Sequence, residues 1–189
     1  MKKALTILFS LTLLGSGANA ADNFDYLDIA YSQQNTDWED FTDSSSTTIK
    51  ASASLFTYAH VRARYHDGNV RFPTNARQET WTAYGIGAHV PVTPGLNLYI
   101  GADHNELELE NRPTERGWYP HIGARYQAND QWQFALEVGE SDVIFKDTTF
   151  FVETIYNILP ALGLSATLRD YDDLDLTEYE VGIRWFFRQ

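Results

Sequence analysis

The chain has 189 residues, no cysteine, and 14 Lys and Arg residues against 26 Asp and Glu residues, which gives a formal net charge of −12. Nucleic-acid binding requires a basic surface, so this acidic chain is expected to have no nucleic-acid partner. Because it has no cysteines, a small disulfide-stapled secreted domain is excluded. A fold held by many backbone hydrogen bonds, such as a sheet or a closed barrel, is favoured instead.

The first 20 residues are typical of a secretory signal peptide. Two lysines precede an apolar run over residues 4–14, and the run ends in small residues with an Ala-Asn-Ala cleavage pattern at 18–20. The apolar run is too short for a membrane-spanning helix, which needs ~20 residues. We therefore predict a signal peptide over residues 1–20 and one mature domain over residues 21–189.

Ten segments of the mature chain alternate apolar and polar residues with a period of two, which is the pattern of a β-strand with one apolar face. Each is close to the ~9–11 residues that a tilted membrane-spanning strand requires. Ten strands are predicted, or eight if the weaker first or eighth segment proves to be a loop. The segments are 24–33, 47–55, 57–66, 79–90, 96–104, 117–127, 131–140, 148–158, 162–172 and a last one that ends at Phe187.

The connections between these segments alternate in length. Short turns are predicted near residue 56 and at 91–95, 128–130 and 159–161, and longer polar loops at 34–46, 67–78, 105–116, 141–147 and 173–176. Short turns on one side and longer loops on the other are typical of bacterial membrane barrels. The alternation does not show which face points inward, and a soluble lipocalin-like barrel would bury the apolar face. The export signal and the loop asymmetry favour the membrane form.

The last segment alternates an apolar, largely aromatic face with a mostly polar one. Its apolar face consists of Tyr179, Val181, Ile183, Trp185 and Phe187. This pattern at the end of an exported chain resembles the closing strand of a bacterial outer-membrane β-barrel, although Arg188 and Gln189 follow the usual terminal aromatic residue.

The mature chain as a whole resembles small outer-membrane barrels of the OmpA-like, OmpX-like and porin-family class. The resemblance implies an all-β, antiparallel, up-and-down transmembrane β-barrel in the bacterial outer membrane, with both termini periplasmic. It also implies contact with outer-membrane lipids and lipopolysaccharide. Insertion would depend on the barrel-assembly machinery, which would recognise the five residues of the closing strand.

If the apolar face meets lipid, the other face of every strand fills the lumen. We expect the charges there to pair through charge-assisted hydrogen bonds and to plug most of a lumen that is also crowded with aromatic residues. A narrow charge-lined pore for small solutes is the alternative. The predicted network contains His60, Arg62, Arg64, His89, Asp103, His121, Arg125, Glu137, Glu153, Arg169, Glu180 and Arg184, with Asp28 and Glu178 on the same face.

The predicted loops are acidic, which indicates either a solvated rim or binding of divalent cations such as Ca²⁺ or Mg²⁺ at the lipopolysaccharide boundary. No EF-hand spacing is present, so no metal ligands are assigned. The acidic residues are Asp37, Glu39, Asp40 and Asp43 in the first loop, Glu106, Glu108 and Glu110 in the third, and Asp170, Asp172, Asp173 and Asp175 around the fifth.

No catalytic constellation is evident. Outer-membrane lipid A deacylases use a Ser and a His close together on one strand, and this chain has no His-x-Ser sequence. Omptin-type proteases use an Asp–His pair, but Asp103 and His104 are adjacent and would face opposite sides of a strand. We therefore predict a non-catalytic barrel without a cofactor, which supports the envelope or presents acidic loops to the outside.

Overall fold

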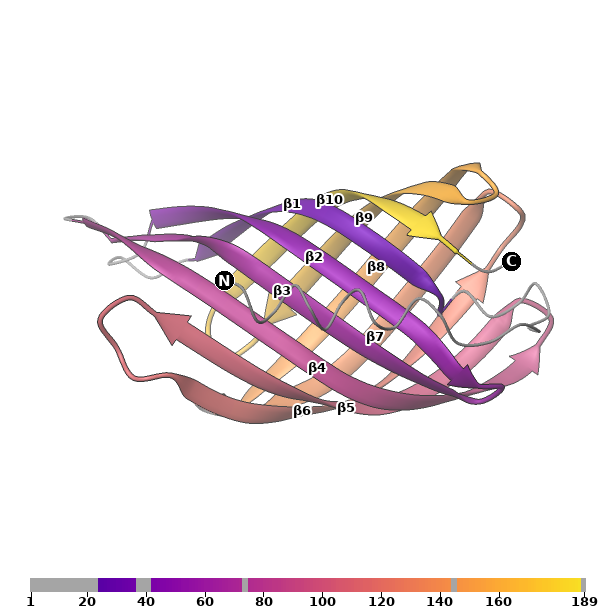
Figure 1. The fold of residues 1–189 in the computed structure, drawn as a ribbon, viewed down its shortest axis with the longest axis horizontal. Helices are drawn as coiled ribbons and strands as arrows, with labels where there is room; N and C mark the ends of the chain where they lie inside the picture. The colour runs from indigo at the N-terminus through magenta and orange to yellow at the C-terminus, as the bar shows by residue number, and fades with distance from the viewer. Residues whose placement is uncertain (1–23, 37–41, 73–74, 144–145, 188–189) are drawn as a thin grey trace.

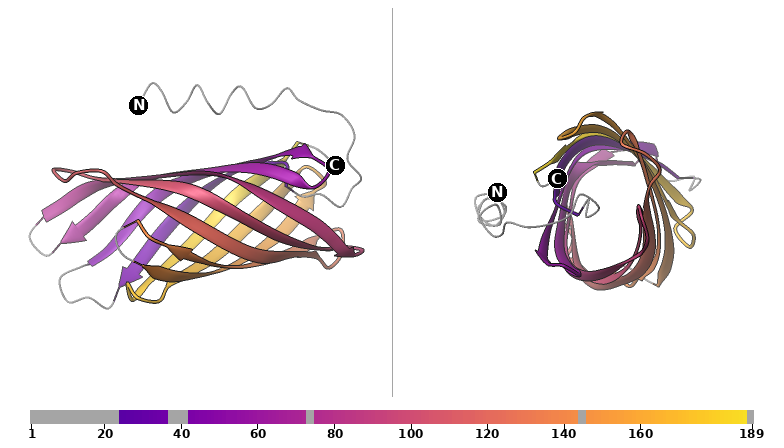
Figure 2. Two further views of the ribbon diagram at one scale, coloured as in Figure 1. Left: turned by 90° about the horizontal axis from the view of Figure 1, so that it is seen from below. Right: turned by 90° about the vertical axis from the view of Figure 1, so that its right-hand side faces the viewer.

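The computed structural model describes residues 24–36, 42–72, 75–143 and 146–187. They form one antiparallel sheet that closes into a barrel, because β1 pairs with both β2 and β10 (Figures 1 and 2). The prediction of ten strands is confirmed, and the eight-stranded alternative is wrong. The strands are β1 (Tyr26–Thr36), β2 (Thr42–Phe56), β3 (Ala59–Phe72), β4 (Asn75–Thr93), β5 (Leu96–Leu109), β6 (Glu115–Gln127), β7 (Trp132–Ser141), β8 (Asp147–Leu159), β9 (Leu162–Tyr171) and β10 (Leu176–Phe186).

The seam between the first and last strands is continuous. β1 and β10 are paired without a register shift from Tyr26 opposite Phe186 to Thr36 opposite Leu176. Such closure leaves no unpaired edge, which a sheet surrounded by lipid requires. Within the described ranges, no helix is long and apolar enough to span a membrane. The predicted signal peptide lies outside the described residues.

Apolar side chains cover the outside of the barrel and polar side chains fill its inside. On the outer face Val181, Ile100 and Ile86 are 66%, 61% and 59% exposed, whereas Arg184 and Glu178, on the inner face, are both 0% exposed. A soluble barrel would have the opposite arrangement, since burial of apolar surface stabilises a fold in water. The sequence pattern left the direction of the faces open, and the structure places the apolar face outward.

Several strands are longer than the alternation predicts. The predicted loop at 67–78 is mostly strand, because β3 continues to Phe72 and β4 begins at Asn75. The predicted loops at 34–46 and 105–116 are also partly strand. In these extensions polar residues such as Ser45, Asn69 and Glu108 face outward. The apolar alternation therefore marks only the band that meets lipid, while the hydrogen-bonded ladder continues beyond it.

The two ends of the barrel differ. The start of β1, the end of β10 and the short turns after β2, β4, β6 and β8 lie at one end, which we call the terminus end (Figure 1). The tips of β2, β3, β4 and β5 extend from the other end, which we call the loop end. This layout matches the predicted alternation of short and long connections.

Candidate functional site: the lumen

Charged side chains in the lumen form three groups of paired residues. Each group is named after the residue at its centre. In the Arg184 group, the buried guanidinium of Arg184 donates hydrogen bonds to Glu153 at 2.5 and 2.8 Å and to Asp28 at 2.9 Å. Lys50 donates to Glu180 at 2.6 Å and lies 3.7 Å from Glu153. These contacts join β1, β2, β8 and β10 through their side chains.

The Arg62 group joins β3, β5, β6 and β7. Nε of Arg62 donates to both carboxylate oxygens of Asp103 at 2.9 Å, and Nη1 donates to Glu137 at 2.7 Å. His121 Nδ1 lies 3.0 Å from Nη2 of Arg62. A guanidinium held by two carboxylates in this way has little freedom to move, since its planar fork fixes the geometry of each pair.

The Glu178 group lies toward the loop end. Arg64 Nη2 donates to both oxygens of Glu178 at 2.7 Å and to Glu180 at 2.8 Å. Arg169 donates to Glu178 at 3.4 Å, and His66 Nδ1 also lies 3.4 Å from this carboxylate. Because Glu180 contacts both Arg64 and Lys50, the Glu178 and Arg184 groups form one continuous network.

Phe24 lies inside the lumen near the terminus end. Its ring stacks on His60 and His89, with centroid distances of 4.4 and 4.2 Å, and the guanidinium of Arg125 lies 4.7 Å from its centroid. Tyr99 meets the same ring edge-on at 6.0 Å. Phe24 was predicted to begin the first strand. Instead it precedes β1 and its side chain is only 3% exposed. Stacking against the other rings in the lumen buries its aromatic surface.

Side chains from opposite walls come close together at two levels of the lumen. In a ring of ten strands β4 faces β9 and β1 faces β6. The rings of Trp81 and Tyr171, on the first of these pairs, have centroids 6.4 Å apart. The guanidinium of Arg125 lies 5.5 Å from the ring of Tyr26, on the second. Side chains therefore meet across the full width of the barrel.

Glycines make room for two of the buried rings. A Cβ at Gly87 would lie 2.6 Å from Nε2 of His60, and a Cβ at Gly101 would lie 2.5 Å from Nε2 of His121. Both distances are too short for any side chain, so the histidine rings occupy the space that these glycines leave free.

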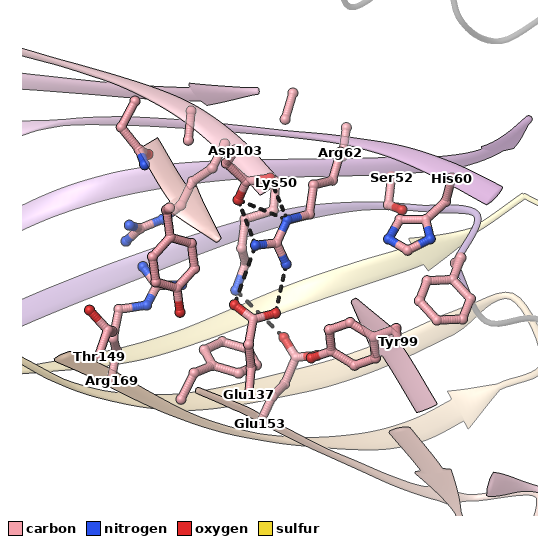
Figure 3. A pocket seen from close by; sticks show the side chains of 18 of the residues that line it. Lys50, Ser52, His60, Arg62, Tyr99, Asp103, Glu137, Thr149, Glu153 and Arg169 are labelled. Atoms are coloured by element: carbon pink, nitrogen blue, oxygen red, sulfur yellow. Dashed lines mark hydrogen bonds and ion pairs between the residues drawn. The ribbon is translucent and has the colours of Figure 1, made fainter. Parts of the chain in front are cut away.

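A cavity of about 100 Å³ remains inside the barrel (Figure 3). Five basic residues line it, namely Lys50, Arg62, Arg64, Arg125 and Arg169, and three acidic ones, Asp103, Glu137 and Glu153. Its wall also includes the aromatic side chains of Trp81, Tyr119, Phe151 and Tyr171.

No family model matches the chain, and neither does any curated protein. Solved structures do match. A KdgM porin superposes with a TM-score of 0.54 at 11% identity, covering 86% of this chain and 99% of its own. A NanC porin gives 0.55 at 11% identity, covering 84% and 98%. The translocator domain of the autotransporter NalP from Neisseria meningitidis gives 0.53 at 11% identity, covering 98% and 94%.

The chain has the fold of a bacterial outer-membrane β-barrel. The matched proteins are described as two porins and a translocator domain, so one architecture serves different purposes among them. At this level of identity the likeness establishes the fold of the barrel and leaves its activity to be argued from the lumen.

The structure brings the predicted lumen residues together inside the barrel. Within the part of the chain it describes, each of the twelve either belongs to one of the three groups or lies against Phe24. Lys50 and His66 were not predicted to belong to the network, although both contact its carboxylates. The period of two in the sequence does place both residues in the lumen. Lys50 and Ser52 lie on the same polar face of their strand, and His66 continues the series of His60, Arg62 and Arg64.

Asp103 and His104 face opposite sides of β5. Asp103 binds Arg62 inside the lumen, whereas the ring of His104 packs outside against Tyr84 and Trp118, with centroid distances of 5.3 and 5.1 Å. In the described ranges, no three His, Asp or Glu side chains are grouped to hold a metal ion. Asp37, Glu39 and Asp40 of the predicted acidic loops lie outside those ranges.

Proposed function

We propose that this barrel is a non-catalytic integral protein of the outer membrane whose lumen is closed to solutes. Its termini would lie in the periplasm and its longer connections outside the cell. The contact between Trp81 and Tyr171 supports closure most directly, because these rings come from opposite walls and meet 6.4 Å apart. Phe24 and the Arg62–Glu137 pair obstruct two further levels of the lumen.

Charge pairing also supports a closed lumen. Six Lys and Arg residues of the lumen, the five in the three groups and Arg125, each lie within 4.0 Å of a carboxylate. A buried charge without a partner would cost several kcal/mol, so such a network resists separation. The basic members are Lys50, Arg62, Arg64, Arg125, Arg169 and Arg184, and the acidic ones are Asp28, Asp103, Glu137, Glu153, Glu178 and Glu180.

A narrow channel for small solutes is the second candidate. The cavity of about 100 Å³ favours it, because it could be one part of a longer path. The KdgM and NanC neighbours are described as porins, and one KdgM structure is a complex with disordered oligogalacturonate. If this barrel shares their role, its basic residues would set the selectivity of the path.

The surface of the barrel has further expected partners. The outward face of β10 carries four of the five residues expected to guide insertion by the barrel-assembly machinery, and Phe187 follows the strand; all five are exposed. Lipids and lipopolysaccharide would surround the apolar band. Divalent cations could bind the acidic connections at the loop end, where Asp172 and Asp173 are exposed.

Removing the obstructions should open the lumen. We expect liposomes with the wild-type barrel to leak potassium no faster than empty liposomes. A triple variant with Phe24→Ala, Arg62→Ala and Trp81→Ala should leak measurably faster, because it widens three levels of the lumen. The matched control replaces the same residue types on the outside, with Phe134→Ala, Arg116→Ala and Trp118→Ala, and should stay tight.

Folding of each variant is checked by its heat-dependent shift on a gel before the leak is measured. Leakage from wild-type liposomes at the rate of the triple variant would support the channel instead. A tight triple variant that is shown to be folded would contradict the assignment of these three side chains as obstructions.

A further inference from the structure

We infer that the luminal cavity is a binding site for one small oxyanion, a phosphate or a carboxylate of similar size. This ligand would be additional to the closed scaffold proposed above, and its binding does not depend on whether the barrel conducts. Three features of the cavity lead to this ligand class: the charge that its surface presents, its unsatisfied polar atoms, and its volume.

The cavity presents positive charge although each of its arginines is paired with a carboxylate. The side chains of Arg62, Arg64 and Arg169 are 23%, 12% and 14% exposed, whereas their carboxylate partners are between 0% and 9% exposed. The acids therefore lie deeper in the wall, and the guanidinium groups form the surface that an ion in the cavity would meet. An anion is favoured there because basic side chains outnumber acidic ones along the lining.

Three of the residues that line the cavity have unsatisfied polar atoms within its wall. Nε of Arg64, the hydroxyl of Tyr119 and the hydroxyl of Thr149 are all buried without a hydrogen-bond partner. The Arg64 nitrogen can only donate, and the two hydroxyls can do so, so a small shift of these side chains toward an acceptor-rich ligand would satisfy them. A cation could not use the Arg64 group. Thr149 and Arg169 lie close together at one end of the cavity in Figure 3.

The volume limits the size of the ligand. An engineered cavity of roughly 150 Å³ holds benzene, with its six heavy atoms. By that measure a cavity of about 100 Å³ holds about four or five heavy atoms, the size of acetate or phosphate. A disaccharide or a longer acid would extend beyond this volume.

The test is equilibrium dialysis of the refolded, full mature barrel in detergent against radiolabelled phosphate, with time allowed for slow entry. We expect saturable binding of one phosphate per barrel. Unlabelled acetate should displace it if the site accepts oxyanions generally, whereas tetraethylammonium should not. Failure of acetate to compete would restrict the site to phosphate and would refute the part of the inference that concerns carboxylates.

Variants separate the cavity from the surface. Arg169→Gln should weaken binding at least tenfold. The double variant Tyr119→Phe with Thr149→Val keeps shape and charge and should weaken it severalfold. Lys146→Gln removes an exposed cation outside the strands and should leave binding unchanged. Absence of saturable binding to folded wild-type protein would overturn the inference, as would equal affinity in all variants. Neither result would bear on closure, which the leak assay measures separately.

Discussion

Replacement of Arg184 with Met is expected to destabilise the folded barrel by about 3–5 kcal/mol. The guanidinium of Arg184 is fully buried and donates hydrogen bonds to Glu153 and Asp28. Without it, the nearest cation to either carboxylate is Lys50, at 3.7 Å from Glu153 and 4.0 Å from Asp28. Urea titration of the protein in lipid vesicles, followed by tryptophan fluorescence, measures the free energy of unfolding.

Two further variants identify the cause of that loss. Arg116→Gln removes an exposed partner of Glu106, at 3.2 Å, and should cost less than about 1 kcal/mol. Arg184→Met combined with Glu153→Met should recover part of the stability, because a buried pair replaced by apolar residues leaves fewer unpaired charges. If the double variant were instead less stable than Arg184→Met alone, the loss of packing rather than the unpaired charge would explain the effect.

Replacement of Val181 with Arg is expected to cost about 2–4 kcal/mol in a bilayer, the range found for a cation on the lipid face of a barrel near the midplane. Val181 lies in the middle of β10 and points outward with 66% of its surface exposed. The loss should appear as a lower urea midpoint for protein folded in vesicles. It tests directly whether lipid surrounds the apolar face.

The matched control for this substitution is Glu108→Arg, which also places a cation on an outward position. Glu108 lies near the loop end of β5, where polar residues face outward, so its replacement should change stability by no more than about 0.5 kcal/mol. Equal tolerance of both substitutions would contradict a lipid-facing position for Val181.

The sequence predicts the strands well where lipid imposes the alternation and less well beyond it. Residues 162–172 were predicted as a strand, and β9 is Leu162–Tyr171, because apolar and polar residues alternate along its whole length. The hairpin of β3 and β4 was predicted as a loop over 67–78, because polar residues such as Asn69 replace apolar ones on its outer face and the apolar signal disappears. Backbone hydrogen bonds between the two strands continue there, although apolar and polar residues no longer alternate.

The identity of the lumen residues could be predicted, but their partners could not. The alternation of apolar and polar residues places Arg62 inside the barrel. The carboxylates that bind it lie 41 and 75 residues further along the chain, at Asp103 and Glu137. Which charges meet depends on the stagger of ten strands around a closed ring, and no local pattern contains that information. Phe24 was missed for a different reason, since it lies just outside the first strand.

The most direct test of a closed lumen is single-channel recording of the refolded wild-type barrel in a planar bilayer. We expect no conductance steps above those of the bare bilayer, because Trp81 meets Tyr171, Arg62 meets Glu137, and Phe24 stacks on its two histidines. The heat-dependent gel shift confirms beforehand that the protein is folded. Steady, discrete openings in most insertions would contradict closure and would make the luminal arginines the selectivity residues of a pore.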